Sequence, residues 1–320
     1  MNKIGFCCQF IDKPTLKMRT TTYTSLSKMS LEDRLTRLRE IAVHNFSVLG
    51  MQIHEILKYP EPIRCFRISS DILPLYTHEL ITPLYEEIIA ELPDISWIGP
   101  FALNNNIRLG FHPGQMTSLC SEKKLNIQNS LNDLEYHGML AGLMNISDPN
   151  FSINIHGNNN IDPGLIRFKN NLQYLSEFVR KSITIENDEF SCGLQDIMNS
   201  GIYHLIPVVI DFHHHWIHSL GEYILPQSDY VAMAKKSWEN RQPLSHVSIS
   251  PKEEIILEND MPSYSKSILN SNRVKLRKHS YDIWSIKFSD YIKEHLSWTD
   301  IEIEAKGKDK AALNLIYNSF

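Results

Sequence analysis

Short apolar runs alternate with longer amphipathic stretches along the whole chain. The short runs, rich in Ile, Val and Phe, predict buried strands, and the stretches with apolar residues every three or four positions predict helices. Such an alternation indicates a parallel α/β sheet, and eight repeats predict a closed TIM (β/α)8 barrel. The predicted strands are 4–8, 65–68, 107–111, 153–155, 183–185, 208–210, 246–249 and 301–303. The predicted helices are 31–57, 83–92, 128–143, 165–179, 194–200, 230–238, 281–294 and 310–317.

The longest predicted helix, 31–57, has clear signals at its N-terminus. Ser30 is a favourable N-cap residue, and Glu32 and Asp33 place negative charge in the first turn. Two polar segments, 218–228 and 248–280, do not follow the alternation. Both come after predicted strands, which places them on the face of the barrel that carries the active site.

Length and composition fit one large barrel. The chain has 320 residues, of which 42% are hydrophobic, and we expect a single domain spanning 1–320. The 5 cysteines form no CxxC pair, so neither a disulfide framework nor a thiolate zinc site is indicated. No apolar run approaches the ~20 residues that cross a bilayer, and the N-terminus leads straight into a strand. We therefore expect a soluble, intracellular protein without a membrane partner.

Residues of the types that ligate metal ions, His, Asp and Glu, stand at the ends of six of the predicted strands. The segments are FHPGQM (111–116), INIHG (153–157), ITIEND (183–188), VVIDFHHHW (208–216), LSHVSIS (244–250) and DIEIEAKGK (300–308). The C-terminal ends of barrel strands meet on one face, where such enzymes hold their catalytic groups. The sequence therefore predicts a metal site there, with candidate ligands His78, His112, His156, Glu186, Asp211, His214, His246, His279 and Glu304.

Each of these residues alone has a structural alternative, because a single His at a strand end usually serves as a hydrogen-bonded structural group. The repetition at equivalent positions is what favours a site. Imidazole and carboxylate ligands without thiolate suit Mn, Zn, Fe or Mg, and mixed sets of this kind are common in multinuclear hydrolytic sites. The net charge of −5 argues against a surface built for nonspecific nucleic-acid binding, although Lys and Arg are concentrated in RVKLRKH (273–279).

Nine motifs, in order, resemble those of the UV damage endonuclease family. They are IGFCC (4–8), FRISSDILPLYTHE (66–79), RLGFHPGQM (108–116), SLNDLEYHGML (130–140), INIHG with the following Arg167 and Phe168, ITIENDE (183–189), IPVVIDFHHH (206–215), SHVSIS (245–250) and IEAKGKDKAAL (303–313). The family is related to endonuclease IV. The resemblance implies a TIM barrel with up to three divalent ions, Mn²⁺ being the expected ion and Zn²⁺ or Mg²⁺ the alternatives.

The resemblance also implies an activity and a set of site residues. Members of the family nick damaged double-stranded DNA immediately 5′ to UV photoproducts, leaving a 3′-hydroxyl and a 5′-phosphate, and we expect this protein to act as a monomer. The nine candidate ligands match the family's metal site, with Glu186, Asp211 and Glu304 as catalytic groups. Gln115 matches a residue that probes the lesion. The other predicted DNA contacts are Met116, Phe6, Arg67, Ser69, Ser70, Lys306 and Lys308.

Three positions depart from the family pattern. Phe6 and Met116 stand where the family usually has Tyr, and Leu244 stands where it commonly has a Lys close to the metals. Leu244 and Met116 leave open a catalytically weakened damage-binding protein. A metal-dependent sugar isomerase stays open because it shares the barrel and the His/Glu/Asp metal ligands, and an abasic-site endonuclease like endonuclease IV is the nearest enzymatic alternative. If Leu244 lies beside the metals, we expect a slow nuclease that needs more metal.

Overall fold

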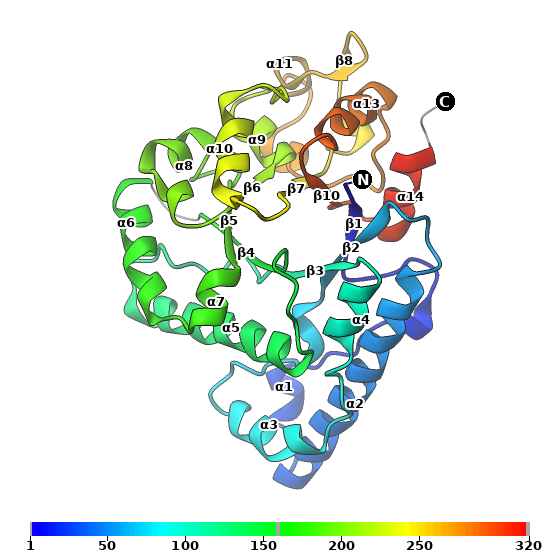
Figure 1. The fold of residues 1–320 in the computed structure, drawn as a ribbon, viewed down its shortest axis with the longest axis vertical. Helices are drawn as coiled ribbons and strands as arrows, with labels where there is room; N and C mark the ends of the chain where they lie inside the picture. The colour runs from blue at the N-terminus through cyan, green and yellow to red at the C-terminus, as the bar shows by residue number, and fades with distance from the viewer. Residues whose placement is uncertain (1, 158–160, 318–320) are drawn as a thin grey trace.

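The computed structural model describes residues 2–157 and 161–317 and shows a closed barrel of parallel strands (Figure 1). Neighbouring strands follow the chain order, and the last strand pairs with the first, Ile4 lying opposite Ile301. This arrangement confirms the predicted TIM-barrel fold. The eight strands are β1 (Ile4–Cys7), β2 (Ile63–Ile68), β3 (Arg108–Phe111), β4 (Ser152–His156), β5 (Ile183–Glu186), β6 (Val208–Asp211), β7 (Leu244–Val247) and β10 (Asp300–Ile303).

Helices connect the strands and surround the barrel (Figure 1). Ser30 caps the longest of them, its side chain accepting a hydrogen bond from the Asp33 N–H at 3.1 Å, as predicted. The helices are α1 (Tyr23–Leu26), α2 (Leu31–Ile56), α3 (Thr82–Ile88), α4 (Ile98–Asn104), α5 (Lys124–Leu143), α6 (Ile161–Asn171), α7 (Glu177–Ser182), α8 (Leu194–Ser200), α9 (Phe212–His218), α10 (Asp229–Trp238), α11 (Tyr264–Ser267), α12 (Arg273–Leu276), α13 (Ile286–His295) and α14 (Lys308–Tyr317).

The alternation of side chains along each strand separates two environments. Ile183 and Ile185 of β5 belong to the large apolar core between the strands and the surrounding helices. Thr184 and Glu186, which alternate with them, point the other way, into the barrel. The same alternation places polar side chains inside the barrel at the C-terminal ends of the strands.

Several predicted boundaries were wrong. Strand seven was predicted at 246–249, but β7 begins two residues earlier, at Leu244, because it pairs along its whole length with β10. Helices α4 and α9 were not predicted. The predicted helix 165–179 is divided into α6 and α7, and the predicted helix 281–294 begins only at Ile286, where the Ser285 side chain accepts a hydrogen bond from Phe288 N–H.

The long polar segment after β7 folds into a short hairpin, β8 (Leu257–Glu258) and β9 (Met261–Pro262), followed by α11 and α12. It follows the C-terminal end of a barrel strand, as expected for a segment on the active face. None of the helices within 2–157 and 161–317 combines the length and the apolar character needed to cross a bilayer.

Candidate metal centre

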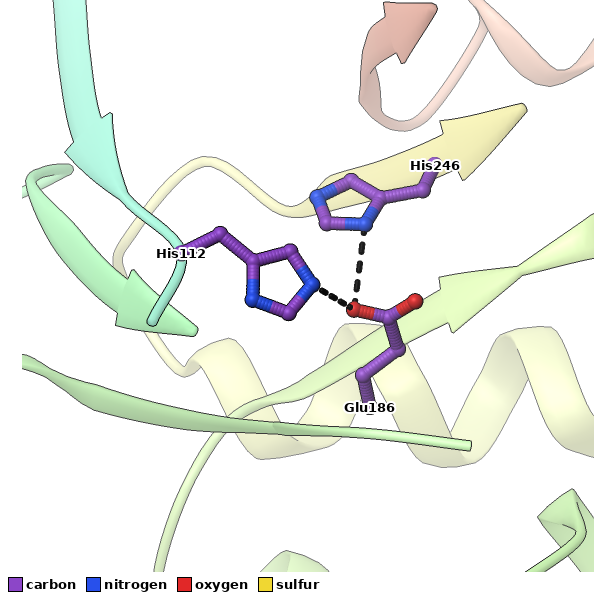
Figure 2. Close-up of side chains that lie close together, drawn as sticks. All are labelled: His112, Glu186 and His246. Carbon is purple, nitrogen blue, oxygen red and sulfur yellow. Dashed lines mark ion pairs between the residues drawn. The ribbon is translucent and has the colours of Figure 1, made fainter. Parts of the chain in front are cut away.

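Three candidate ligands from different strands meet around one carboxylate (Figure 2). Glu186 ends β5, His112 follows β3, and His246 lies in β7. The Glu186 Oε2 is 3.1 Å from His112 Nε2 and 3.1 Å from His246 Nδ1. One ligand atom from each residue falls within 4.8 Å of the others, which is close enough for one ion to bind all three.

A second group shares the same carboxylate. It combines Glu186 with His156, the last residue of β4, and with His214 in the first turn of α9. The second oxygen of Glu186, Oε1, is 3.3 Å from His214 Nδ1. Because both groups contain Glu186, its carboxylate would be shared between two ions if each group held one, as in two-metal hydrolytic sites.

Asp211 and Asn187 hold the start of α9 in place. The Asp211 side chain caps the helix by accepting a hydrogen bond from the His214 N–H at 2.6 Å. Asn187 and Asp211 exchange two hydrogen bonds, at 2.9 and 3.0 Å, which tie the exit of β5 to the exit of β6. The local turn therefore points Asp211 and His214 toward the same centre, as predicted from their spacing of three residues.

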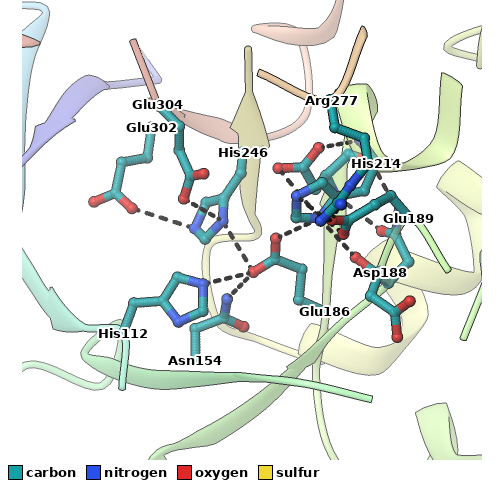
Figure 3. A network of polar contacts seen from close by, with 12 residues as sticks. His112, Asn154, Glu186, Asp188, Glu189, His214, His246, Arg277, Glu302 and Glu304 are labelled. Carbon is teal, nitrogen blue, oxygen red and sulfur yellow. Dashed lines mark hydrogen bonds and ion pairs between the residues drawn. The ribbon is translucent and has the colours of Figure 1, made fainter. Parts of the chain in front are cut away.

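Two further carboxylates, Glu302 and Glu304, lie beside His246 (Figure 3), and a buried arginine, Arg67, joins them. Arg67 Nε donates to Glu302 Oε2 at 2.7 Å, and its Nη2 lies 2.5 Å from Glu304 Oε1. Glu302 Oε2 is also 3.2 Å from His246 Nε2. The two ring nitrogens of His246 thus have different surroundings: Nε2 faces Glu302, and Nδ1 faces Glu186 and Glu304.

The electrostatics of the cluster favour bound cations. Burial disfavours charge on His246, but the neighbouring carboxylates of Glu186 and Glu302 together outweigh it and raise the pKa of His246 to about 10. Burial raises the pKa of Asp211 to about 7, with Glu186 and Glu304 adding to that effect and His214 opposing it. Burial lowers the pKa of His156 to about 4, which keeps this imidazole neutral, as metal ligation requires.

The donor set fits divalent metal ions. Buried atoms without a hydrogen-bond partner include His112 Nδ1, His156 Nδ1 and Asp211 Oδ2. Buried polar atoms are nearly always paired, so a concentration of unpaired donors and acceptors around carboxylates indicates ligands for a cation. The groups are imidazole and carboxylate, which suit Mn²⁺, Zn²⁺ or Mg²⁺. The identity and number of the ions stay predictions.

His279 and His78 lie differently from the other candidates. His279 Nδ1 is 3.9 Å from Glu304 Oε2, at the outer edge of the cluster. His78 instead stacks on the ring of Tyr23 at 4.3 Å, and its Nδ1 accepts the Leu80 N–H at 3.2 Å. Among the described residues His78 belongs to neither ligand group, so the structure gives no support to its predicted role.

The predicted DNA contacts fall into different environments. Gln115 and Met116 are exposed just after His112, and Met116 has 87% of its surface exposed. Lys306 and Lys308 line a cavity of about 280 Å³ together with Arg67, His279 and Glu304. These positions remain accessible to a DNA strand that reaches the metal centre.

One predicted contact needs correction. Phe6 is fully buried and packs against Phe10, Phe66 and Tyr59 on the helix side of β1, so it has no surface to offer DNA. Arg67 is paired with Glu302 and Glu304 inside the barrel and lines the same cavity as Lys306 and Lys308, and its contact with DNA stays a prediction.

Ser69 and Ser70 serve the local structure. Ser69 accepts the Asp71 N–H at 3.2 Å, and the Ser70 hydroxyl is 2.8 Å from His137 Nε2. Their predicted role in binding phosphate stays a prediction.

Leu244 also differs from its expected place. It belongs to a buried apolar cluster with Cys65, Val209 and Trp238, in the layer beneath His246. In this register the position is part of the apolar packing below the metal centre, whereas the resemblance implied a place beside the ions.

Glu302 was not predicted, although the sequence carries a signal for it. Glu302 lies in β10 and Glu304 directly follows this strand, and the two alternate with buried Ile301 and Ile303, so both point into the barrel. A carboxylate that accepts the far N–H of a ligating imidazole fixes its tautomer and orientation. We therefore expect Glu302 to orient His246 with Nδ1 free for the metal.

Replacing Glu302 tests this role. We expect Glu302→Met to lower the affinity for Mn²⁺ by about 10–100-fold, the usual loss for such partners. Glu302→Gln, which keeps an acceptor oxygen, should lose less. Calorimetric Mn²⁺ titration gives the affinities, and thermal melting gives the stability. Unchanged Mn²⁺ affinity in both variants, with reduced stability, would assign Glu302 a purely structural role.

The fold and the site together define a TIM-barrel protein with a candidate multinuclear metal centre at the C-terminal ends of its strands. A sequence model of the family described as UV-endonuclease UvdE matches residues 2–319, and the chain belongs to this family. The resemblance found in the sequence is thereby confirmed.

Individual relatives agree with this family. The UV DNA damage endonuclease of Bacillus mycoides (strain KBAB4) is 30% identical over 306 residues, covering 93% of this chain and 88% of that protein. The one from Bacillus anthracis (strain A0248) is 29% identical over 304 residues, with the same coverage of both chains.

Solved structures share the fold. The crystal structure of SacUVDE superposes with a TM-score of 0.76 at 22% identity, covering 99% of this chain and 97% of that one. Endonuclease IV from Thermus thermophilus has a TM-score of 0.50 at 12% identity, covering 84% of this chain and 91% of that one.

Proposed function

We propose that the protein is a metal-dependent endonuclease that hydrolyses the phosphodiester immediately 5′ to UV photoproducts in double-stranded DNA. The position of Glu186 is the main support for this proposal, because its carboxylate belongs to both groups of imidazole ligands on the active face of the barrel. Membership in the UV-endonuclease UvdE family supports the substrate. The ions would be held by His112, His156, Glu186, His214 and His246, with Asp211, His279 and Glu304 beside them.

Bound divalent ions would neutralise the charge of the scissile phosphate and activate a water molecule for in-line attack. The protein's own groups prepare this reaction. Glu186 and Asp211 supply anionic charge that holds cations close together, and the buried Arg67 orients Glu302 and Glu304. Lys306 and Lys308 at the mouth of the cavity place positive charge where the phosphates of the DNA backbone would lie.

Lesion recognition is assigned to the loop after β3. A photoproduct weakens base stacking, so the damaged step costs less to open than an intact one. Met116 is an apolar side chain with 87% exposure, four residues after His112 of the metal centre, and is suited to entering such a step as a wedge. Gln115 beside it provides hydrogen-bonding groups for the opened bases.

The loop can be tested with a double variant. We expect Gln115→Ala/Met116→Ala to reduce the preference for damaged over intact duplex by about tenfold, the effect of losing ~1–3 kcal/mol of contact with the bases. The metal content should stay that of the wild type. Fluorescence anisotropy with matched damaged and intact duplexes measures the preference. An unchanged preference would remove the loop from lesion recognition.

The proposed activity is tested by nicking of supercoiled plasmid. UV-irradiated plasmid should be nicked in the presence of Mn²⁺ and left intact after addition of EDTA, while unirradiated plasmid stays supercoiled. A third plasmid with abasic sites tests the alternative of an endonuclease IV-like activity. Preferential nicking of the abasic plasmid would replace the proposed substrate.

A further inference from the structure

The basic segment 273–279 packs onto the loop that follows β5 (Figure 3). Arg277 Nε donates to Glu189 Oε1 at 2.8 Å, and Arg273 Nη2 donates to the Glu189 backbone carbonyl at 2.5 Å. Glu189 in turn lies beside the metal centre, with its Oε2 3.7 Å from His214 Nε2. The loop and the basic segment therefore form one connected wall of the site.

Phe190 lies on this wall with its ring exposed to solvent. Its side chain is 54% exposed, although the Arg277 guanidinium carbon lies only 3.7 Å from the ring centroid, and that of Arg273 lies 5.5 Å away. The backbone is fixed as well, because Asp188 Oδ1 accepts the N–H groups of Phe190 and Ser191 at 2.7 and 2.6 Å. The exposed ring is thus held in one position by a stacked cation and a hydrogen-bonded turn.

The charged residues around the Phe190 ring indicate what kind of ligand it would bind. Lys275 and Lys278 are exposed on the same short segment, Lys275 being paired with Glu254 at 3.2 Å, so the segment is rich in positive charge in a chain of net charge −5. A basic surface with an exposed aromatic ring is the arrangement that binds single-stranded or unstacked nucleic acid, since every base presents a π-face and every nucleotide a phosphate.

We propose that Phe190 and Arg277 form a stacking site for a base of the DNA strand that is displaced from the helix near the metal centre. The proposal rests on the proposed function and adds a second DNA contact, from the loop after β5, to the one proposed for Gln115 and Met116 in the loop after β3. In this role Phe190 holds the substrate and takes no part in the chemistry. Its loss should weaken DNA binding and raise KM while leaving kcat and metal affinity unchanged.

The test compares Phe190→Leu with Phe190→Trp and with a matched control, Phe178→Leu. Phe178 is 40% exposed on α7 and lines a cavity with Ile206 and Pro207, just before β6, at the other end of the barrel. The probe is a duplex with one cyclobutane dimer, methylphosphonate linkages on both sides of it to prevent cleavage, and 2-aminopurine in the neighbouring step. Affinity and fluorescence are measured with Mn²⁺-loaded protein, and KM and kcat with the cleavable duplex.

We expect Phe190→Leu to bind the damaged duplex about 10-fold more weakly and to lose the fluorescence quenching caused by stacking. Phe190→Trp should keep both the affinity and the quenching of the wild type. Phe178→Leu should match the wild type in both measurements. Wild-type affinity and quenching in Phe190→Leu would overturn the stacking site. A wild type that binds the damaged duplex but never nicks it would overturn the proposed function alone, because the affinity of Phe190→Leu is measured without cleavage. A wild type that does not bind DNA would overturn both.

Discussion

Replacing Glu186 with Gln is expected to reduce nicking at least about 100-fold, because even partners that only orient a metal ligand typically contribute 10–100-fold. Glu186 is the one residue common to both ligand groups, and its two oxygens face His112, His246 and His214. A neutral amide cannot balance two adjacent cations, and one end of it offers N–H donors where the ions need acceptors. Bound metal should fall along with activity.

The measurement combines elemental analysis of the purified variant with plasmid nicking. Glu177→Gln is a matched control, since Glu177 is 71% exposed and its Lys181 partner is on the same short helix. The control should keep wild-type metal content and rate. Full nicking by Glu186→Gln with metal still bound would remove Glu186 from the site and with it the main support for the proposed mechanism.

The second large effect concerns Leu244. We expect Leu244→Lys to lower the free energy of unfolding by about 3 kcal/mol or more, because it would bury a second cation in the layer where Asp300 already balances the charge of Arg108. Leu244 is 5% exposed and packs with Cys65, Val209 and Trp238. Mn²⁺ affinity should change little, because the ligand groups lie in the layer above.

Thermal melting and Mn²⁺ titration on the same variant separate the two interpretations of this position. Leu244→Met, which conserves volume, should cost less than about 1.5 kcal/mol and leave both measurements near the wild type. A normal melting temperature with an altered Mn²⁺ requirement would instead show that position 244 reaches the metals, as the family resemblance implies.

The sequence predicted the barrel because strand and helix periods alternate so regularly. It also placed the candidate ligands His112, His156, Glu186, His214 and His246 at or just after strand ends, and the structure brings these side chains together. Their role as metal ligands stays a prediction. The failures have physical causes. Phe6 lies within one of the family motifs, but which face of a strand a side chain takes depends on register. The period of two put Phe6 on the helix side of β1. His78 lies in a loop, where no periodicity fixes direction.

Contacts between segments far apart in the chain could not be predicted from the sequence either. The ion pair of Arg67 with Glu302 and that of Arg277 with Glu189 join residues far apart along the chain, and only the closed barrel brings them together. Glu302 itself could have been found, because it alternates with Ile301 and Ile303 in the same way as Glu304 does. The exposed ring of Phe190 carried no sequence signal that separates it from an ordinary surface aromatic residue.

The most direct test of the proposed function uses a labelled duplex with a single, positioned photoproduct, incubated with Mn²⁺-loaded protein and resolved on a sequencing gel. The proposal predicts one cut, immediately 5′ to the lesion, with a 3′-hydroxyl and a 5′-phosphate, and no cut by Glu186→Gln or in the undamaged duplex. Equal cutting of damaged and undamaged duplex, or no cutting by metal-loaded wild type, would contradict it.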